Sequence, residues 1–307
     1  MAKDKHIDLD SLTTEARNPR SEGMDRLDTI DIVRLINAED ATVADAVADV
    51  TPAIAQAVDI IAERLSRGGR LVYTGAGTSG RLGVLDAVEC PPTFNADPEQ
   101  VVGLIAGGEG ALLRAVEGAE DSPEQGADDL RRIGLTEKDV VVGIAASGRT
   151  PYVLGALDYA RETGAAAIGL ACNAGAGIED HADFCIVPVV GPEVLSGSTR
   201  MKAGTATKMV LNMLTTGAMI RLGKTYGNLM VDVQATNEKL VERSIRIVCS
   251  ITACSREEAK EALDRSGGEV KTAVVVRALD VGAEEARSRL KAAGNRLGEV
   301  LDGGQAD

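Results

Sequence analysis

Three short loops of small, hydroxyl-bearing residues have the composition of a phosphate-binding site. The stretches "GTSGR" at 77–81 and "AASGRT" at 145–150 share Ser-Gly-Arg directly after an apolar run, and "SGST" at 196–199 opens a long helical pattern. Backbone N–H groups at helix N-termini and Ser or Thr hydroxyls both donate hydrogen bonds to anions. The candidate phosphate ligands in the loops are Thr78, Ser79, Ser147, Ser196, Ser198 and Thr199. Lys202 is a further candidate, as a cation in the first turn of the helix that the third loop opens.

Three features of the sequence argue against a nucleotide as the ligand. The first loop lacks the G-x-x-x-x-G-K-[ST] pattern of a P-loop. No acidic residue follows this loop at the position that would bind a ribose hydroxyl. No predicted strand ends in an acidic residue that would bind magnesium. Hydroxyl-rich loops therefore favour a compact phosphorylated sugar.

Carboxylates are the main candidates for proton transfer, because the chain has only two histidines, His6 and His181. We expect His181 in a loop with a structural role. Glu89 precedes Pro91-Pro92, which we expect to end the helix that the first loop begins. A carboxylate in a last helical turn faces the negative end of the helix dipole, which favours its protonated form and suits a proton donor.

A second carboxylate is expected from "VEGAEDS" at 116–122. We place Glu117, Glu120 and Asp121 at the end of a helix over 109–120, at the same edge of the fold as the loops. Sequence spacing does not choose among the three. Each could also be a solvated surface side chain.

The order of apolar runs and helical patterns predicts an α/β fold with a parallel sheet and flanking helices. Continuous β-branched runs separated by helices are typical of strands that are buried on both faces. The expected strands are 70–74, 101–106, 139–145, 166–171 and 184–189, and the expected helices are 29–38, 40–66, 79–89, 109–120, 151–163 and 200–222. Ligands of such sheets bind beyond the carboxyl ends of the strands, where all three loops fall.

The pattern changes near residue 230 to an all-helical region over 238–301, in which Ser255 and Glu258 have the spacing of a capping box. We therefore expect an extended N-terminal arm over 1–23, a sugar-phosphate-binding domain over 24–237 and a small helical domain over 238–307.

Composition limits the partners and the compartment. The chain carries 47 Asp and Glu residues against 33 Lys and Arg residues, a net charge of −14, which argues against nucleic acid or an anionic membrane as a partner. Five cysteines without paired spacing predict free thiols and a cytoplasmic location. The most membrane-like stretch, 209–222, is too short and too polar to span a bilayer.

Several longer motifs carry a family resemblance. The hydroxyl loops on a parallel sheet resemble the sugar isomerase (SIS) fold. More specifically, the chain resembles the N-acetylmuramic acid 6-phosphate etherase family over nearly its whole length. The motifs are "LTTEARNP" (12–19), "GAGTSGRLGVLDAVECPPTF" (75–94), "VEGAEDS" (116–122) and "GPEVLSGSTRMKAGTATKMVLN" (191–212). The last motif also occurs in the vertebrate glucokinase regulatory protein.

The resemblance implies a lyase that removes D-lactate from N-acetylmuramic acid 6-phosphate, in amino-sugar recycling, without a metal or other cofactor. It implies Glu89 as the proton donor and selects Glu120 as the base. It implies that the six hydroxyl-bearing loop residues above contact the substrate, whereas Lys202 stays a candidate from its position in the helix, and it implies that the protein is a homodimer. Arg17 and Asn18 of the arm are further candidates, whereas Glu15 and Glu22 could be purely solvated. The C-terminal helices resemble a ubiquitin-associated-like unit, which we interpret as a packing and dimer element.

Two other functions remain open at this point. An aldose–ketose isomerase of the same fold would need a base that serves C1 and C2, and no lactyl pocket. A non-catalytic sugar-phosphate sensor would keep the loops but would need no pair of Glu89 and Glu120, so the presence of both carboxylates favours the etherase.

Overall fold

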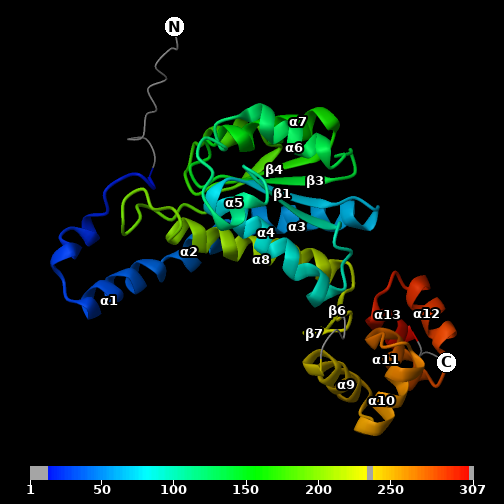
Figure 1. Cartoon of the computed structure of the whole chain (residues 1–307). Helices are drawn as coiled ribbons and strands as arrows, with labels where there is room; N and C mark the ends of the chain where they lie inside the picture. Colours follow the sequence, from blue (N-terminus) through cyan, green and yellow to red (C-terminus); the bar gives the residue numbers. More distant parts are fainter. Residues whose placement is uncertain (1–12, 234–237, 304–307) are drawn as a thin grey trace. The chain divides into compact units, whose positions relative to one another are not determined.

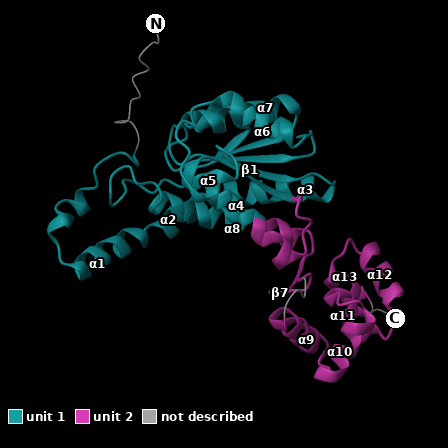
Figure 2. Ribbon diagram, viewed as in Figure 1, with its two compact units in different colours: residues 1–87, 101–214 teal, residues 88–100, 215–307 magenta. Residues whose placement is uncertain are grey.

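The structure is a computed structural model of the chain that describes residues 13–233 and 238–303. The chain divides into two compact units (Figure 2). The first comprises residues 1–87 and 101–214, and the second comprises residues 88–100 and 215–307. By this measure the second unit begins earlier than the expected domain boundary at 237/238. Most of the expected arm, residues 1–12, lies outside the described residues.

The first unit is built on a five-stranded parallel sheet in the order β2-β1-β3-β4-β5. The predicted strands are confirmed, although the last is shorter than expected. The three central strands are β1, β3 and β4, and nearly every residue in them is buried. The observed bounds are β1 Leu71–Gly75, β2 Val101–Ile105, β3 Val140–Ile144, β4 Ala166–Leu170 and β5 Phe184–Ile186.

Helices cover both faces of this sheet, which confirms the predicted fold class (Figure 1). On one face lie α6 (Pro123–Arg132) and α7 (Pro151–Thr163). The other face carries α3 (Thr51–Ser66), α4 (Gly77–Phe94) and the start of α8 (Lys202–Arg221). Strand alternation explains the two layers: Gly143 faces Leu157 of α7, whereas its neighbour Ile144 faces α4 at Gly83.

The helix pattern before the sheet was predicted with errors. The expected helix over 40–66 is two helices, α2 (Val43–Ala48) and α3, because the chain leaves the helical conformation at Val50 and restarts with Pro52 in the first turn of α3. Helix α1 (Thr29–Asp40) agrees with the prediction. Its only buried residue is Glu39.

The prediction of one helix over 109–120 was wrong. The structure has a short α5 (Gly110–Leu113), a loop, and then α6, which was not predicted. Arg81 donates to the carbonyl oxygens of Ala111 at 2.7 Å and Leu112 at 3.1 Å. Because these carbonyls are occupied by a guanidinium and Arg114 is extended, the helix ends there.

The second unit is mainly helical, as predicted for the C-terminal region. It also holds a small hairpin that the sequence did not predict, formed by β6 (Thr225–Tyr226) and β7 (Leu229–Met230). The capping box of Ser255 and Glu258 is confirmed. The C-terminal helices are α9 (Glu238–Thr252), α10 (Arg256–Arg265), α11 (Val270–Leu279), α12 (Ala283–Ala292) and α13 (Leu297–Gly303). Among the described residues, no helix is long and apolar enough to cross a membrane.

Candidate functional site

The sheet order places a switch point between β1 and β3. From β1 the chain crosses to β2 on one side, and from β2 it returns to β3 on the other side of β1. In open parallel sheets, ligands bind at such a point, beyond the carboxyl ends of the strands. The stretch at 77–81 begins α4 directly after β1, and the loop at 145–150 follows β3 directly, so the fold brings the first two predicted phosphate loops to this edge of the sheet.

The first loop runs straight into the N-terminus of α4. Gly80 lies so close to the end of β1 that an added Cβ would be 2.6 Å from the carbonyl oxygen of Gly75. The N–H groups of a first helical turn have no acceptor within the helix, so they are available to a ligand together with the half-buried Thr78 and Ser79. Gly75, Gly77 and Gly80 also share the G-x-G-x-x-G spacing of dinucleotide sites, so this spacing by itself does not separate the two ligand classes.

The second loop is held rigidly against the segment that follows β4. Gly148 has a φ of 67°, and a Cβ there would be 2.2 Å from the Cβ of Ala176. Its carbonyl oxygen accepts a hydrogen bond of 2.8 Å from the N–H of Ile178. The Ser147 hydroxyl accepts a 3.3 Å hydrogen bond from the N–H of Arg149, and Ser147 is half-buried.

The third loop meets the first at the start of α8. A Cβ added to Gly204 would lie 3.8 Å from Cγ2 of Thr78, so Thr78 lies beside the first turn of α8. Ser198 and Thr199 of this loop are half-buried and Ser196 is exposed. Side chains from the first and third loops therefore share one neighbourhood.

The N-terminus of α8 is already occupied by a carboxylate of the protein itself. The two oxygens of Glu193, which is fully buried, accept 2.9 Å hydrogen bonds from the backbone N–H groups of Lys202 and Ala203. This is the position where an anionic ligand of α8 was expected. A substrate phosphate is therefore left with the hydroxyls of the third loop rather than these two N–H groups.

Lys202 is buried and has a counter-charge inside the protein. Its ammonium nitrogen lies 2.9 Å from Oε2 of Glu39 on α1, and both side chains are nearly inaccessible. Asn18 donates a 2.9 Å hydrogen bond to the same oxygen, and Arg20 lies 3.0 Å from the other. Burial raises the pKa of Glu39, but the hydrogen bonds from Lys202 and Asn18 outweigh it and hold that pKa below its usual value.

The described part of the N-terminal arm, from residue 13, packs on the second and third loops. Asn173, directly after β4, donates a 2.8 Å hydrogen bond to the carbonyl oxygen of Ala146. The same side chain accepts a 2.8 Å bond from the hydroxyl of Thr13 and a 3.2 Å bond from the N–H of Thr14. The carbonyl oxygen of Thr14 in turn accepts a 3.3 Å bond from the N–H of Gly197.

Glu120 lies in an exposed turn instead of at a helix end. The turn is positioned through its backbone, because the N–H of Tyr152 in the first turn of α7 donates a 3.0 Å hydrogen bond to the carbonyl oxygen of Glu120. Since α7 follows the second loop directly, this bond brings Glu120 to the loop end of α7. Glu117 and Asp121 flank it and are exposed as well.

Glu89 is not in a last helical turn, which corrects the prediction. α4 continues through Pro91 and Pro92 to Phe94. Proline removes one N–H and restricts its neighbours but does not always end a helix. Here the helix stops at Asn95, which has a φ of 50° and whose N–H bonds the carbonyl oxygen of Pro91 at 2.9 Å. The dipole argument for Glu89 as a proton donor therefore loses its basis. Its exposed side chain belongs to the second unit, whereas Glu120 belongs to the first.

Comparison with known proteins decides the family. A relative from Pasteurella multocida named N-acetylmuramic acid 6-phosphate etherase is 56% identical over 293 residues, which are 95% of this chain and 97% of the relative. Relatives of the same name from Photobacterium profundum and Mycolicibacterium smegmatis are 60% and 55% identical, over 92% and 97% of this chain and 94% and 100% of theirs. The chain belongs to the N-acetylmuramic acid 6-phosphate etherase family.

Models of smaller regions agree with this etherase family and with the fold. The SIS domain model matches residues 124–217, and the model of the glucokinase regulatory protein N-terminal SIS domain matches residues 53–161. A model described as the C-terminal lid domain of glucokinase regulatory protein matches residues 227–281. The two regulatory-protein models cover residues 53–161 and 227–281, whereas residues 191–212, on which the predicted relation rested, fall within the SIS domain model.

The sequence predicted the loops of this candidate site but missed the polar residues that hold them. Asn173 could have been found, because it follows a buried strand at the same sheet edge as the loops. Glu39 and Glu193 gave no signal, since nothing in the sequence indicates that a carboxylate on α1 pairs with Lys202 or that Glu193 caps α8.

Proposed function

We propose that this protein cleaves the D-lactyl ether of N-acetylmuramic acid 6-phosphate to give N-acetylglucosamine 6-phosphate and D-lactate. The observation that carries the proposal is 55–60% identity, over more than nine-tenths of the chain, to relatives with this activity in their names. The three hydroxyl loops at the sheet edge support it, because they suit the phosphate of such a sugar.

The proposed chemistry is an elimination followed by a hydration. Opening of the sugar ring exposes an aldehyde, which acidifies the hydrogen on C2. The carboxylate of Glu120 takes this proton, the C3–O bond breaks, and the departing lactate oxygen receives a proton from Glu89. Water then adds its hydroxyl to C3 and a proton to C2 of the unsaturated aldehyde.

We assign the substrate phosphate to Thr78, Ser79, Ser147, Ser196, Ser198 and Thr199. The half-buried positions of most of these residues and the proximity of Thr78 to α8 support this assignment. We propose that Lys202 mainly holds the third loop in place through Glu39, and its direct contact with substrate stays a prediction from the sequence. The convergence of Glu89 and Glu120 on one sugar is likewise part of the proposal.

We propose that the protein works as a homodimer in the cytoplasm. Support for the dimer comes from α1 and the residues before it, where Leu27, Ile30 and Val33 are 42%, 53% and 55% exposed. A second copy would cover such apolar side chains. The five free cysteines fit a reducing compartment.

One experiment tests the function and the role of Glu120. Purified protein is incubated with N-acetylmuramic acid 6-phosphate, and D-lactate is measured. We expect Glu120→Ala to lower the rate by about 10²–10⁴-fold, the usual contribution of a positioned base. Glu117→Ala is the matched control, because it removes an exposed carboxylate from the same turn and should leave the rate nearly unchanged.

The same experiment separates the etherase from the other candidates. Two of the matching models are named after a regulatory protein, so ligand-dependent thermal stabilisation is measured in parallel. Stabilisation without any D-lactate would identify a sugar-phosphate sensor. Interconversion of aldose and ketose phosphates without D-lactate would identify an isomerase. Either result would overturn the etherase proposal.

A further inference from the structure

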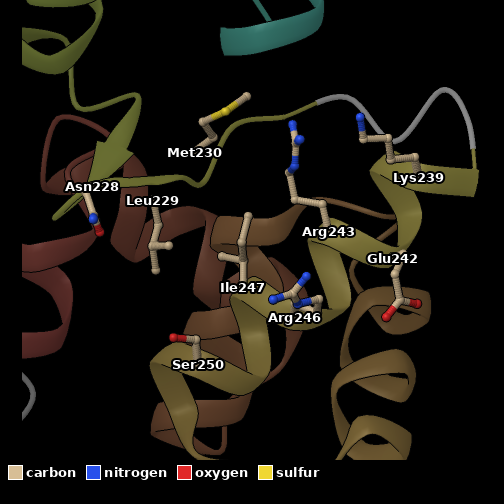
Figure 3. Close-up of a pocket in the computed structure, with 9 residues that line it drawn as sticks. All are labelled: Asn228, Leu229, Met230, Lys239, Glu242, Arg243, Arg246, Ile247 and Ser250. Atoms are coloured by element: carbon tan, nitrogen blue, oxygen red, sulfur yellow. The ribbon is translucent and has the colours of Figure 1, made fainter.

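The second unit contains a cavity that the proposed reaction does not use. It has a volume of about 470 Å³ and lies between the β6–β7 hairpin and α9 (Figure 3). This volume is within the range of about 300–1,000 Å³ that is usual for small-molecule sites. The lining residues, all within the second unit, are Asn228, Leu229, Met230, Lys239, Glu242, Arg243, Arg246, Ile247 and Ser250.

The cavity is positively charged in a strongly acidic protein. Lys239, Arg243 and Arg246 line it, spaced four and three residues apart on α9, so they are neighbours on the helix surface. Like charges at these spacings repel each other unless an anion lies among them.

The one carboxylate in the lining is hydrogen-bonded to a cation outside the cavity. Arg256 of α10 holds both oxygens of Glu242, each at 2.6 Å. Hydrogen bonding to Arg256, together with the charges of Arg256 and Arg246, lowers the pKa of Glu242, so this carboxylate stays ionised and offsets part of the charge of Arg246. Within the described residues, no ion pair joins Lys239, Arg243 or Arg246 to a carboxylate.

The first acidic residue that follows the hairpin in the sequence, Asp232, is paired with lysines outside the cavity lining. Asp232 lies 3.0 Å from the ammonium groups of both Lys224 and Lys271. Figure 3 shows Lys239 and Arg243 extending to the same side of α9, with Arg246 beside Ile247, while Glu242 extends toward the next helix. Lys239 and Arg243 are therefore available to a ligand, and Arg246 adds a positive charge that Glu242 offsets in part.

The other walls define the rest of the ligand. Leu229, Met230 and Ile247 give an apolar surface, and Asn228 and Ser250 add hydrogen-bonding groups. Arginine forks suit phosphate and carboxylate oxygens. We propose that this cavity binds a small organic anion, with a phosphate or carboxylate head group on the cations and an apolar body against the three aliphatic side chains.

This site is independent of the proposed etherase reaction, so the test must report on the cavity alone. Full-length protein is labelled with ¹³C on its methionine methyl groups, and the Met230 signal is identified from its absence in Met230→Leu. The probes are phenyl phosphate, benzoate, inorganic phosphate and the neutral benzyl alcohol. Each is titrated to about 10 mM, because a dissociation constant above this concentration would correspond to only a small binding free energy. Comparison of the two aromatic anions distinguishes a phosphate from a carboxylate head group.

The variant that tests the cations is Arg243→Gln with Arg246→Gln, which keeps most of the aliphatic stem and so limits the loss of packing. The control is Lys260→Ala with Arg265→Ala, which removes two exposed positive charges from α10 in the same unit. An unchanged Met230 signal without probe verifies that each variant is folded.

We expect at least one aromatic anion to shift the Met230 methyl signal saturably in the wild type. The dissociation constant should rise about tenfold or more in the Arg243 and Arg246 variant and stay unchanged in the control, whereas benzyl alcohol should give no saturable shift. An absence of any shift with both anions overturns the proposal. So does equal binding by the wild type and the double glutamine variant, or equal binding of benzyl alcohol and the anions.

Discussion

At the scale of single residues, the buried pair of Lys202 and Glu39 connects α8 with α1. Removing one partner of a buried ion pair leaves an uncompensated charge, which is much less favourable than removing an exposed pair. Because Asn18 and Arg20 also contact Glu39, one carboxylate fixes both the start of α8 and the arm. The third hydroxyl loop lies between these two segments.

We predict that Glu39→Gln lowers the free energy of unfolding at pH 7 by about 1–3 kcal/mol, because an amide oxygen replaces the counter-charge of a buried ammonium. Urea unfolding measures the change. The matched control is Asp31→Asn on the same helix, whose pair with Arg34 is exposed, and it should change the value by less than about 0.5 kcal/mol. Equal stability of wild type and Glu39→Gln would contradict the structural role of this pair.

The pair should also give a pH dependence with a defined sign. Because the pKa of Glu39 is lower in the folded protein than in the unfolded chain, its contribution is present above the unfolded pKa, about 4.3. It is lost as pH falls through the folded pKa. The stability difference between wild type and Glu39→Gln should therefore shrink as pH falls from 5 toward about 3. A difference that stays constant over this range would contradict the lowered pKa.

At the scale of elements, the first loop depends on how closely α4 approaches β1. A Cβ at Gly80 would lie 2.6 Å from the Gly75 carbonyl oxygen and 2.7 Å from Cγ1 of Ile105, and neither backbone nor a packed core side chain can yield at low energy. Any side chain at this position must push the first turn of α4, and with it Thr78 and Ser79, away from the sheet edge.

We predict that Gly80→Ala destabilises the protein by about 1–3 kcal/mol and raises the KM for the sugar phosphate. Gly110→Ala is the control, since it also changes a helical glycine but an added Cβ there meets nothing within 4 Å. Alanine is the better helix former, so this control should be neutral or slightly stabilising. The measurements are urea unfolding and steady-state kinetics. An unchanged KM in Gly80→Ala would show that the first loop does not position the phosphate.

The elements that the sequence predicted well are those with a strong local pattern. The first four strands and α7 fall within about one residue of their expected bounds, because burial on both faces leaves a continuous apolar run, whereas β5 ends three residues earlier than expected. The sequence also carries a start signal for α6, although this helix was not predicted. The Ser122 hydroxyl accepts a 3.2 Å hydrogen bond from the N–H of Gln125, and Pro123 takes the first helical position.

The elements that could not be predicted depend on contacts distant in sequence. α5 ends at Leu113 because Arg81, about thirty residues earlier, takes its last carbonyls. α4 continues through Pro91 and Pro92 to Phe94, which is buried. Local rules favour a break of the helix before the two prolines. The same holds for the candidate site, where local patterns found the loops but not Glu39 and Glu193, which hold them.

At the scale of the whole molecule, the predicted homodimer can be tested on α1. This helix buries only Glu39, yet it carries Ile30 and Val33, each more than half exposed. Apolar side chains grouped on one helix are typical of a surface that a partner covers. The resemblance predicts a second copy of the same chain as that partner.

We predict that Ile30→Glu with Val33→Glu converts the protein to a monomer, because two carboxylates would have to be desolvated in the interface. Light scattering after size-exclusion chromatography gives the mass, and circular dichroism verifies the fold. Asn37→Glu with Ala38→Glu is the control, since it adds the same charge to exposed positions of the same helix. If the wild type is a dimer and the Ile30 and Val33 variant remains one, the interface lies elsewhere on the chain. If the wild type is monomeric at micromolar concentration, the predicted homodimer is wrong.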